Sequence, residues 1–183
     1  MSVRVLVTGG VRSGKSRVAE QLLLYLGDGP EHPSAATYLA CGPQRDDADW
    51  AARVAAHRDR RPDAWATVET ADAARVLRET PGPVLLDCVG TWLTAQLDGL
   101  DAWSAPETAW GPALEQRVDA LVAAWSGHDA VVAVTNEVGW GLVSEHRSGR
   151  VFADRLGLAN QRLAEHADRV LLVVAGQVLT VKG

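Results

Sequence analysis

The chain has 183 residues, 47% of them hydrophobic and 22% charged, with a formal net charge of −5. This composition excludes a disordered, collagen-like or fibrous chain, and the length predicts a single domain over residues 1–183. The acidic balance argues against a nucleic-acid-binding surface but leaves room for a bound nucleotide. The sequence has no apolar run of 18 or more residues and no signal-peptide pattern near its start. We therefore expect no membrane span and a cytoplasmic location.

Buried apolar runs alternate with segments of helical periodicity along the chain. Strands are expected at 3–7, 36–40, 65–68, 83–87, 130–135, 170–174 and 178–181, and helices at 15–26, 46–61, 71–78, from Pro112 to Trp125, and at 151–166. Residues 89–105 show no clear period, and Ser104 to Glu107 match a capping box. Gly99 to Gly111 is expected to be a surface excursion. The alternation predicts an α/β fold with a mostly parallel sheet, helices on both faces and an edge hairpin formed by the last two strands.

A glycine-rich segment between the first strand and the first helix fits the pattern GxxxxGK[ST]. Glycines let such a loop curl so that backbone N–H groups face phosphate oxygens, and the helix presents its positive N-terminus to the same anion. The context of strand, loop and helix predicts a nucleoside triphosphate site. Its candidate nucleotide-binding residues are Gly9, Gly10, Val11, Arg12, Ser13, Gly14, Lys15 and Ser16.

Lys15 is one of two lysines in a chain that has sixteen arginines. We expect Lys15 to act catalytically by reaching the β- and γ-phosphates, and the Ser16 hydroxyl to ligate Mg²⁺. Arg12 either contacts phosphate or is a solvated loop charge.

Two acidic residues follow buried strands. Mg²⁺ in nucleotide sites is usually also held by an acid at the end of a strand, and Asp87 ends the run Val84-Leu85-Leu86-Asp87. We expect Asp87 to bind both the metal and the nucleotide, although it could instead cap the next turn. Glu137 follows the strand at 130–135, and the spacing does not decide which of the two acids holds the metal.

Several residues favour no chemistry by themselves. Cys41 and Cys88 are far apart and outside any CxxC pattern, so two buried thiols are expected. His32 and His128 are expected to be solvated, and His166 to end a helix. A lone histidine such as His57 is more often structural, although arginines surround it in the sequence.

Five segments together carry more information than the phosphate loop alone. They read GGVRSGKSR at 9–17, RVAAH at 53–57, LLDC at 85–88, VTNEVGWG at 134–141 and RVFAD at 150–154. Over essentially its whole length, the chain resembles the bifunctional adenosylcobinamide kinase / adenosylcobinamide-phosphate guanylyltransferase family of cobalamin biosynthesis. The resemblance implies a RecA-like P-loop fold and a trimer.

The resemblance also implies two reactions. ATP or GTP phosphorylates the terminal hydroxyl of adenosylcobinamide, and GMP then passes from GTP to that phosphate, releasing pyrophosphate. The second reaction runs through a GMP–histidine intermediate, and the matching nucleophile is His57. Guanine nucleotide contacts fall on Arg58, Asp59, Arg60, Arg61 and Glu69, and the nucleotide-binding set further includes Cys41, Gly42 and Pro43.

The chain departs from the family pattern at Trp50, Ser144, His146 and Leu158. These changes leave the nucleotide motifs intact but bear on the corrinoid pocket or a subunit contact. The seven tryptophans suggest an aromatic platform for the flat corrinoid, although core or interface packing is the more common role of any one of them. Trp140, which lies between two glycines in a loop, is the best candidate for the platform. Two alternatives stay open: a P-loop kinase of small molecules without nucleotidyl transfer, and a nucleotide-gated switch or assembly ATPase.

Overall fold

The computed structural model of the chain describes residues 2–26, 35–42 and 61–183. The described strands form one seven-stranded sheet in the order β3-β2-β4-β5-β1-β6-β7. All neighbouring strands are parallel except the β6–β7 pair. This confirms the α/β class and the edge hairpin. The strands are β1 (Val3–Gly9), β2 (Thr37–Ala40), β3 (Ala66–Glu69), β4 (Val84–Asp87), β5 (Ala130–Val134), β6 (Arg169–Val174) and β7 (Gln177–Lys182).

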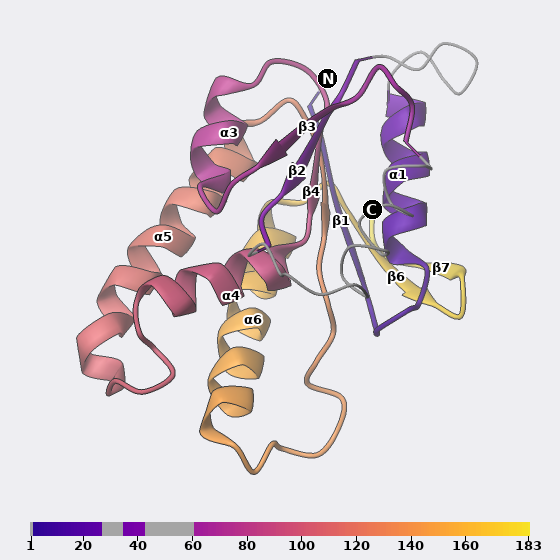
Figure 1. Cartoon of the computed structure of the whole chain (residues 1–183). Coiled ribbons are helices and arrows are strands. Elements are labelled where there is room, and N and C mark those ends of the chain that lie inside the picture. The colour runs from indigo at the N-terminus through magenta and orange to yellow at the C-terminus, as the bar shows by residue number, and fades with distance from the viewer. Residues whose placement is uncertain (1, 27–34, 43–60) are drawn as a thin grey trace.

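Helices cover both faces of the sheet (Figure 1). Among the described helices, α1 (Lys15–Leu26) covers one face, and the opposite face carries α3 (Ala73–Glu79), α4 (Val89–Gly99), α5 (Glu107–Gly127) and α6 (Arg147–His166). Strand β1 shows why both faces are apolar. Val5 and Val7 belong to the core beneath α1, whereas Leu6 belongs to the core beneath the other helices. Successive strand side chains point to opposite faces, so a central strand must be apolar throughout.

Between β4 and β5 the structure differs from the expectation at two helices. Residues 89–99 form helix α4, whose periodicity is obscured because Gly90 and Gln96 are buried along with its apolar side chains. Helix α5 begins five residues before Pro112 and has no side-chain cap, because the Ser104 hydroxyl donates instead to Asp101 Oδ1 at 2.6 Å. The stretch from Gly99 to Gly111 is largely exposed, as expected of a surface excursion, although Ala102 and Trp110 within it are buried.

Most other boundaries agree with the expected ones within two residues, but α6 begins four residues earlier than expected. The helix expected at 46–61 lies, apart from Arg61, outside the described residues. His166 does end α6, but His128 is buried rather than solvated, and burial lowers its pKa. Both cysteines are free and buried, as expected.

The start of β1 is joined to the start of β6 by Asp168. Its carboxylate accepts hydrogen bonds from the Arg4 guanidinium at 3.0 Å and from the Arg4 backbone N–H at 2.8 Å. These bonds hold the pKa of Asp168 below its usual value of 3.8. A carboxylate with a depressed pKa stabilises the fold above its unfolded pKa, and this stabilisation is lost as pH falls through its folded pKa.

Asp168→Asn should therefore lower the free energy of unfolding at pH 7 by less than about 1 kcal/mol, because the pair is partly exposed. The difference from the unmodified chain should shrink below about pH 4, where the carboxylate becomes protonated. Urea denaturation at a series of pH values measures both effects. A difference that stays constant down to pH 2 would contradict this account.

Candidate nucleotide site

The phosphate loop connects β1 to α1 at the carboxyl edge of the sheet. Its backbone needs unusual conformations, since Gly14 has a φ of +95° and Arg12 a φ of +57°. The Lys15 ammonium donates a hydrogen bond to the Gly10 carbonyl at 3.0 Å, so this side chain folds back over the loop. The loop thus holds its cation at the N-terminus of α1, where an anion is also favoured by the helix dipole.

Strand β6 fixes the shape of the same loop. A Cβ at Gly9 would lie 2.4 Å from the carbonyl oxygen of Val173, a contact that no side chain can make. Further along, the Gly176 backbone N–H donates to the Ser13 carbonyl at 2.9 Å. The first glycine of the motif is therefore required by packing against β6.

Of the two candidate metal acids, Asp87 ends β4 and Glu137 follows the end of the adjacent strand β5. Strand β5 lies between β1 and β4, and Asp87 is in register with Val134. Glu137 is joined directly to the end of β1: its Oε1 accepts from the Thr8 hydroxyl at 2.6 Å, and its backbone N–H donates to the Gly9 carbonyl at 3.2 Å. Both carboxylates therefore lie at the carboxyl edge that carries the phosphate loop.

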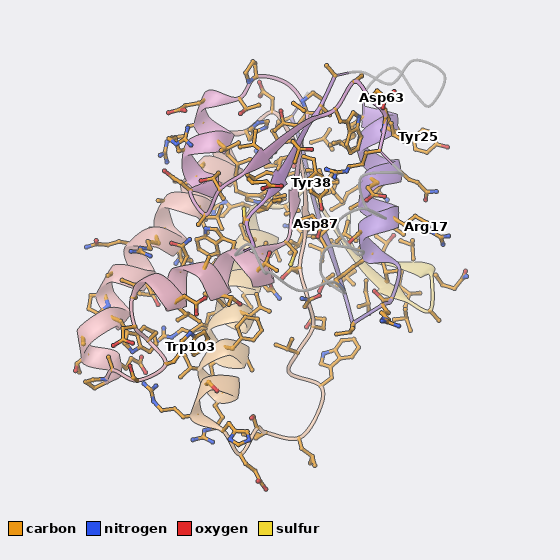
Figure 2. All side chains as sticks on the ribbon, viewed as in Figure 1. Arg17, Tyr25, Tyr38, Asp63, Asp87 and Trp103 are labelled. Carbon is orange, nitrogen blue, oxygen red and sulfur yellow. The ribbon has the colours of Figure 1, made fainter. Side chains whose placement is uncertain are left out.

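Asp87 is held by a tyrosine that sequence reasoning missed (Figure 2). The Tyr38 hydroxyl donates to Asp87 Oδ2 at 3.2 Å, and the Arg61 guanidinium lies 3.7 Å from the centre of the tyrosine ring. Burial, and then the Asp87 charge, raise the pKa of Tyr38, so the phenol stays protonated and remains a donor. Tyr38 thereby lies between Asp87, the acid that ends β4, and Arg61.

The remaining predicted residues are placed only in part. Glu69 ends β3 in register with Ala40, which puts it at the same edge as Cys41 and Gly42. The Cys41 thiol is buried and its pKa is raised by burial, so a nucleotide contact there would use the main chain. Pro43, His57, Arg58, Asp59, Arg60 and Trp50 lie outside the described residues.

The oxygen donors at this edge suit Mg²⁺. No group of three or more His, Cys, Asp or Glu side chains that could hold a metal occurs among residues 2–26, 35–42 and 61–183. Mg²⁺ does not require such a group, since it usually takes one or two protein oxygens and completes its shell with water and substrate phosphates. A carboxylate together with the Ser16 hydroxyl would meet that requirement.

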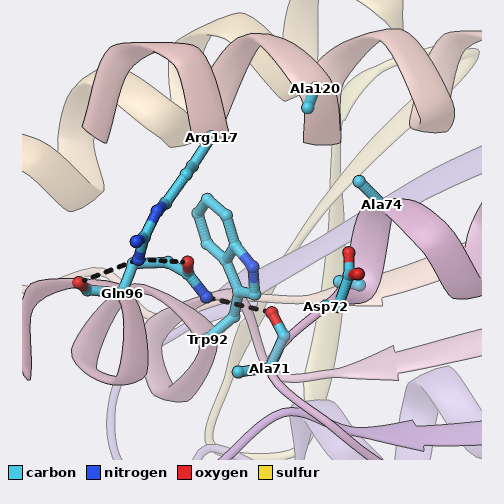
Figure 3. Close-up of a pocket in the computed structure, with 8 residues that line it drawn as sticks. Ala71, Asp72, Ala74, Trp92, Gln96, Arg117 and Ala120 are labelled. Atoms are coloured by element: carbon cyan, nitrogen blue, oxygen red, sulfur yellow. Dashed lines mark hydrogen bonds between the residues drawn. The ribbon is translucent and has the colours of Figure 1, made fainter. Parts of the chain in front are cut away.

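A separate pocket lies between α3, α4 and α5 (Figure 3). Its polar groups bond to one another: Gln96 Nε2 donates to the Ala71 carbonyl at 2.9 Å, and Arg117 Nη1 donates to Gln96 Oε1 at 3.0 Å. Trp92 forms its apolar wall. These contacts join the three helices, and none of the predicted site residues lines the pocket.

Comparison with known proteins decides what kind of nucleotide enzyme this is. Residues 5–181 match the family model described as cobinamide kinase / cobinamide phosphate guanyltransferase. The chain belongs to this family. This confirms the resemblance read from the motifs. With the P-loop on β1 and one strand between it and β4, the fold is the RecA-like P-loop fold of the prediction.

Individual relatives are similar over nearly their whole length. The bifunctional adenosylcobalamin biosynthesis protein CobU of Salmonella typhimurium strain LT2 is 41% identical, over 97% of this chain and 99% of the relative. The protein of the same name from Escherichia coli strain K12 gives the same identity and coverage. Among solved structures, the flagellar accessory protein FlaH of Methanocaldococcus jannaschii has a TM-score of 0.48 and 8% identity, covering 98% of this chain and 78% of that one.

Proposed function

We propose that residues 9–16 hold the nucleotide in both reactions of this bifunctional enzyme, cobinamide kinase and cobinamide phosphate guanylyltransferase. The observation that supports this is the phosphate loop on β1, with Glu137 and Asp87 at the carboxyl ends of the next two strands. In the first reaction, the terminal hydroxyl of adenosylcobinamide attacks the γ-phosphorus of ATP or GTP. The hydroxyl proton is lost, the bond to the β-phosphate oxygen breaks and the nucleoside diphosphate leaves.

Charge placement is the main contribution of these residues to phosphoryl transfer. Negative charge spreads over the oxygens of the transferred group, and a positioned ammonium and backbone N–H groups stabilise it. Lys15 is the positioned ammonium. Mg²⁺ held by Ser16 and a strand-end carboxylate would neutralise further phosphate charge.

The second reaction uses His57, which lies outside the described residues. A neutral imidazole nitrogen attacks the α-phosphorus of GTP and pyrophosphate leaves, giving a phosphoramidate. The phosphate of adenosylcobinamide phosphate then attacks the same phosphorus, the P–N bond breaks and adenosylcobinamide-GDP forms. Arg58, Asp59, Arg60, Arg61 and Glu69 complete the guanine nucleotide site in this proposal.

Both acids accept a hydrogen bond, Glu137 from Thr8 at 2.6 Å and Asp87 from Tyr38 at 3.2 Å, and the shorter bond to Glu137 supports Asp87 as the metal acid. Asp87→Asn should raise the Mg²⁺ concentration for half-maximal kinase rate about tenfold or more, because a neutral amide is a poor ligand for a hard dication. Glu137→Gln is the matched control and should shift that concentration less. Initial rates over a series of Mg²⁺ concentrations measure the shift in both variants. A larger shift in Glu137→Gln would show that Glu137, and not Asp87, is the metal acid.

An assay on adenosylcobinamide with ATP and GTP supplied separately tests the whole proposal. ATP alone should yield only the phosphorylated product, and GTP should carry the reaction to adenosylcobinamide-GDP. A product that stops at the phosphate with GTP would favour the kinase without nucleotidyl transfer, and hydrolysis without any corrinoid product would favour a switch or assembly ATPase.

Two further expectations stay predictions. None of the described helices is long and apolar enough to cross a membrane. The cytoplasmic location stays the expectation stated above from the sequence itself, and the trimer stays the expectation implied by the family resemblance. Light scattering of the purified chain measures the oligomeric state.

A further inference from the structure

Residues 138–143, between β5 and α6, form an apolar segment on the surface. The side chains of Trp140, Leu142 and Val143 are 73%, 101% and 80% exposed, and Val138 is exposed as well. Large hydrophobic side chains grouped in this way, rather than scattered singly, mark a binding surface.

The segment is anchored at both of its ends. At the start, Glu137 bonds to Thr8 and Gly9, as described above. Beyond its end, Arg150 Nη1 donates to the Ser144 carbonyl at 2.9 Å from the first turns of α6. The apolar side chains are therefore presented to solvent by a loop whose two ends are fixed by hydrogen bonds.

The same anchors place the segment beside the phosphate loop. Glu137 bonds to Gly9, the first residue of that loop, and both segments extend beyond the same end of the sheet (Figure 1). Val11, within the phosphate loop, is also 79% exposed. An apolar surface thus adjoins the place where the γ-phosphate is transferred.

We infer that residues 138–143 bind the corrin ring of the substrate, with the Trp140 indole stacked on the ring. The inference rests on the proposed function. The hydroxyl that is phosphorylated ends a short arm of a large, flat macrocycle, so when the hydroxyl is at the γ-phosphate the ring must lie just outside the loop. The faces of such a ring are apolar, and an aromatic side chain is the residue best suited to stack on them.

The glycines on either side of Trp140 support this assignment. Apart from its own chain neighbours, no heavy atom of residues 2–26, 35–42 and 61–183 would lie within 4 Å of a Cβ at Gly139 or at Gly141. The indole therefore stands in open space on a backbone without bulk on either side, which leaves room for a macrocycle to approach its face.

Trp140→Ala tests the inference, with Trp140→Phe as the conservative variant and Tyr25→Ala as a control. Tyr25 is 69% exposed and lies near the end of the molecule opposite to the carboxyl edge of the sheet, where residues 138–143 are (Figure 2). In kinase assays, Trp140→Ala should raise the KM for adenosylcobinamide about tenfold while leaving kcat and the KM for ATP within twofold. This pattern is expected when a group binds ground state and transition state equally. Trp140→Phe should restore most of the loss, and Tyr25→Ala should change nothing.

A second measurement needs no turnover. Corrinoids absorb in the near-ultraviolet, where tryptophan emits, so cobinamide should quench the fluorescence of the chain as it binds. Trp140→Phe should keep the dissociation constant within about threefold and reduce the quenching amplitude, because the emitter nearest the ring is gone.

The outcomes separate this inference from the proposed function. A wild-type chain that phosphorylates adenosylcobinamide together with an unchanged corrinoid KM in Trp140→Ala would overturn the inference alone. A wild-type chain that neither binds nor phosphorylates cobinamide would overturn both. If Trp140→Ala dissociates an oligomer while its corrinoid KM is unchanged, the segment is a contact between copies of the chain, and the inference is again wrong.

Discussion

Lys15→Ala should reduce the kinase kcat by at least about 100-fold. Lys15 is the cation that the loop holds over its own backbone, bonded to the Gly10 carbonyl at 3.0 Å. When a nucleotide binds, this ammonium meets the charge that spreads over the transferred phosphoryl group, and removing one such group from a preorganised site costs about two to three orders of magnitude. Initial rates with saturating ATP and adenosylcobinamide measure the loss, and circular dichroism should stay native.

Two variants sharpen this test. Lys15→Arg keeps the positive charge but replaces a compact ammonium by a larger, planar guanidinium group. This variant should therefore recover only a small part of the kinase kcat. Lys182→Ala removes the other lysine, whose ammonium donates to the Ala164 and Glu165 carbonyls at the end of α6. It should leave kcat unchanged. Near-normal turnover in Lys15→Ala would remove the basis for the whole account of the loop.

His57→Ala should separate the two reactions. The kinase step needs no covalent histidine, because the substrate hydroxyl attacks the γ-phosphorus directly. Guanylyl transfer should be abolished, since no imidazole remains to attack the α-phosphorus of GTP. The variant should therefore accumulate adenosylcobinamide phosphate and take up no label from α-labelled GTP. In the unmodified chain the label should be acid-labile and base-stable, as expected of a phosphoramidate.

The pH dependence and a matched control complete this experiment. Protonation removes the imidazole lone pair, so labelling should weaken in acidic solution. His166→Ala, at the exposed end of α6, should be labelled normally. The assignment of His57 as the nucleophile would be contradicted if His57→Ala still took up label, or if peptide sequencing placed the label on another residue.

The sequence predicted the parts of this molecule that depend on local patterns. Central strands such as β4 and β5 are buried on both faces, so their apolar runs are unmistakable, and the phosphate loop carries its chemistry within eight consecutive residues. Helix α4 was missed because its buried face includes the polar Gln96 and also Gly90, which lowers helix propensity. Tertiary packing decides the conformation of such a segment.

The missed site residues have a different cause. Tyr38 lies in an ordinary apolar strand, and its importance comes from Asp87, 49 positions later, which is reached only through the pairing of β2 with β4. Thr8 likewise matters because Glu137 is next to it in space. Strand order was needed to find either contact. A polar atom near the carboxyl end of an otherwise apolar strand is a signal that could have drawn attention to Thr8, whereas Tyr38, the second residue of β2, carries no such signal.

The dependence of the phosphate loop on β6 bears on when the site can form during synthesis. Gly9 packs against Val173, and Ser13 accepts from Gly176, so a loop made within the first sixteen residues takes its shape from residues made more than 150 positions later. A ribosome-bound chain that ends before β6 would expose one edge of β1 and lack the backbone that supports the loop. A bound nucleotide can thus stabilise the folded state only after residues 169–176 have been synthesised. The incomplete sheet that forms before then is not stabilised by the ligand.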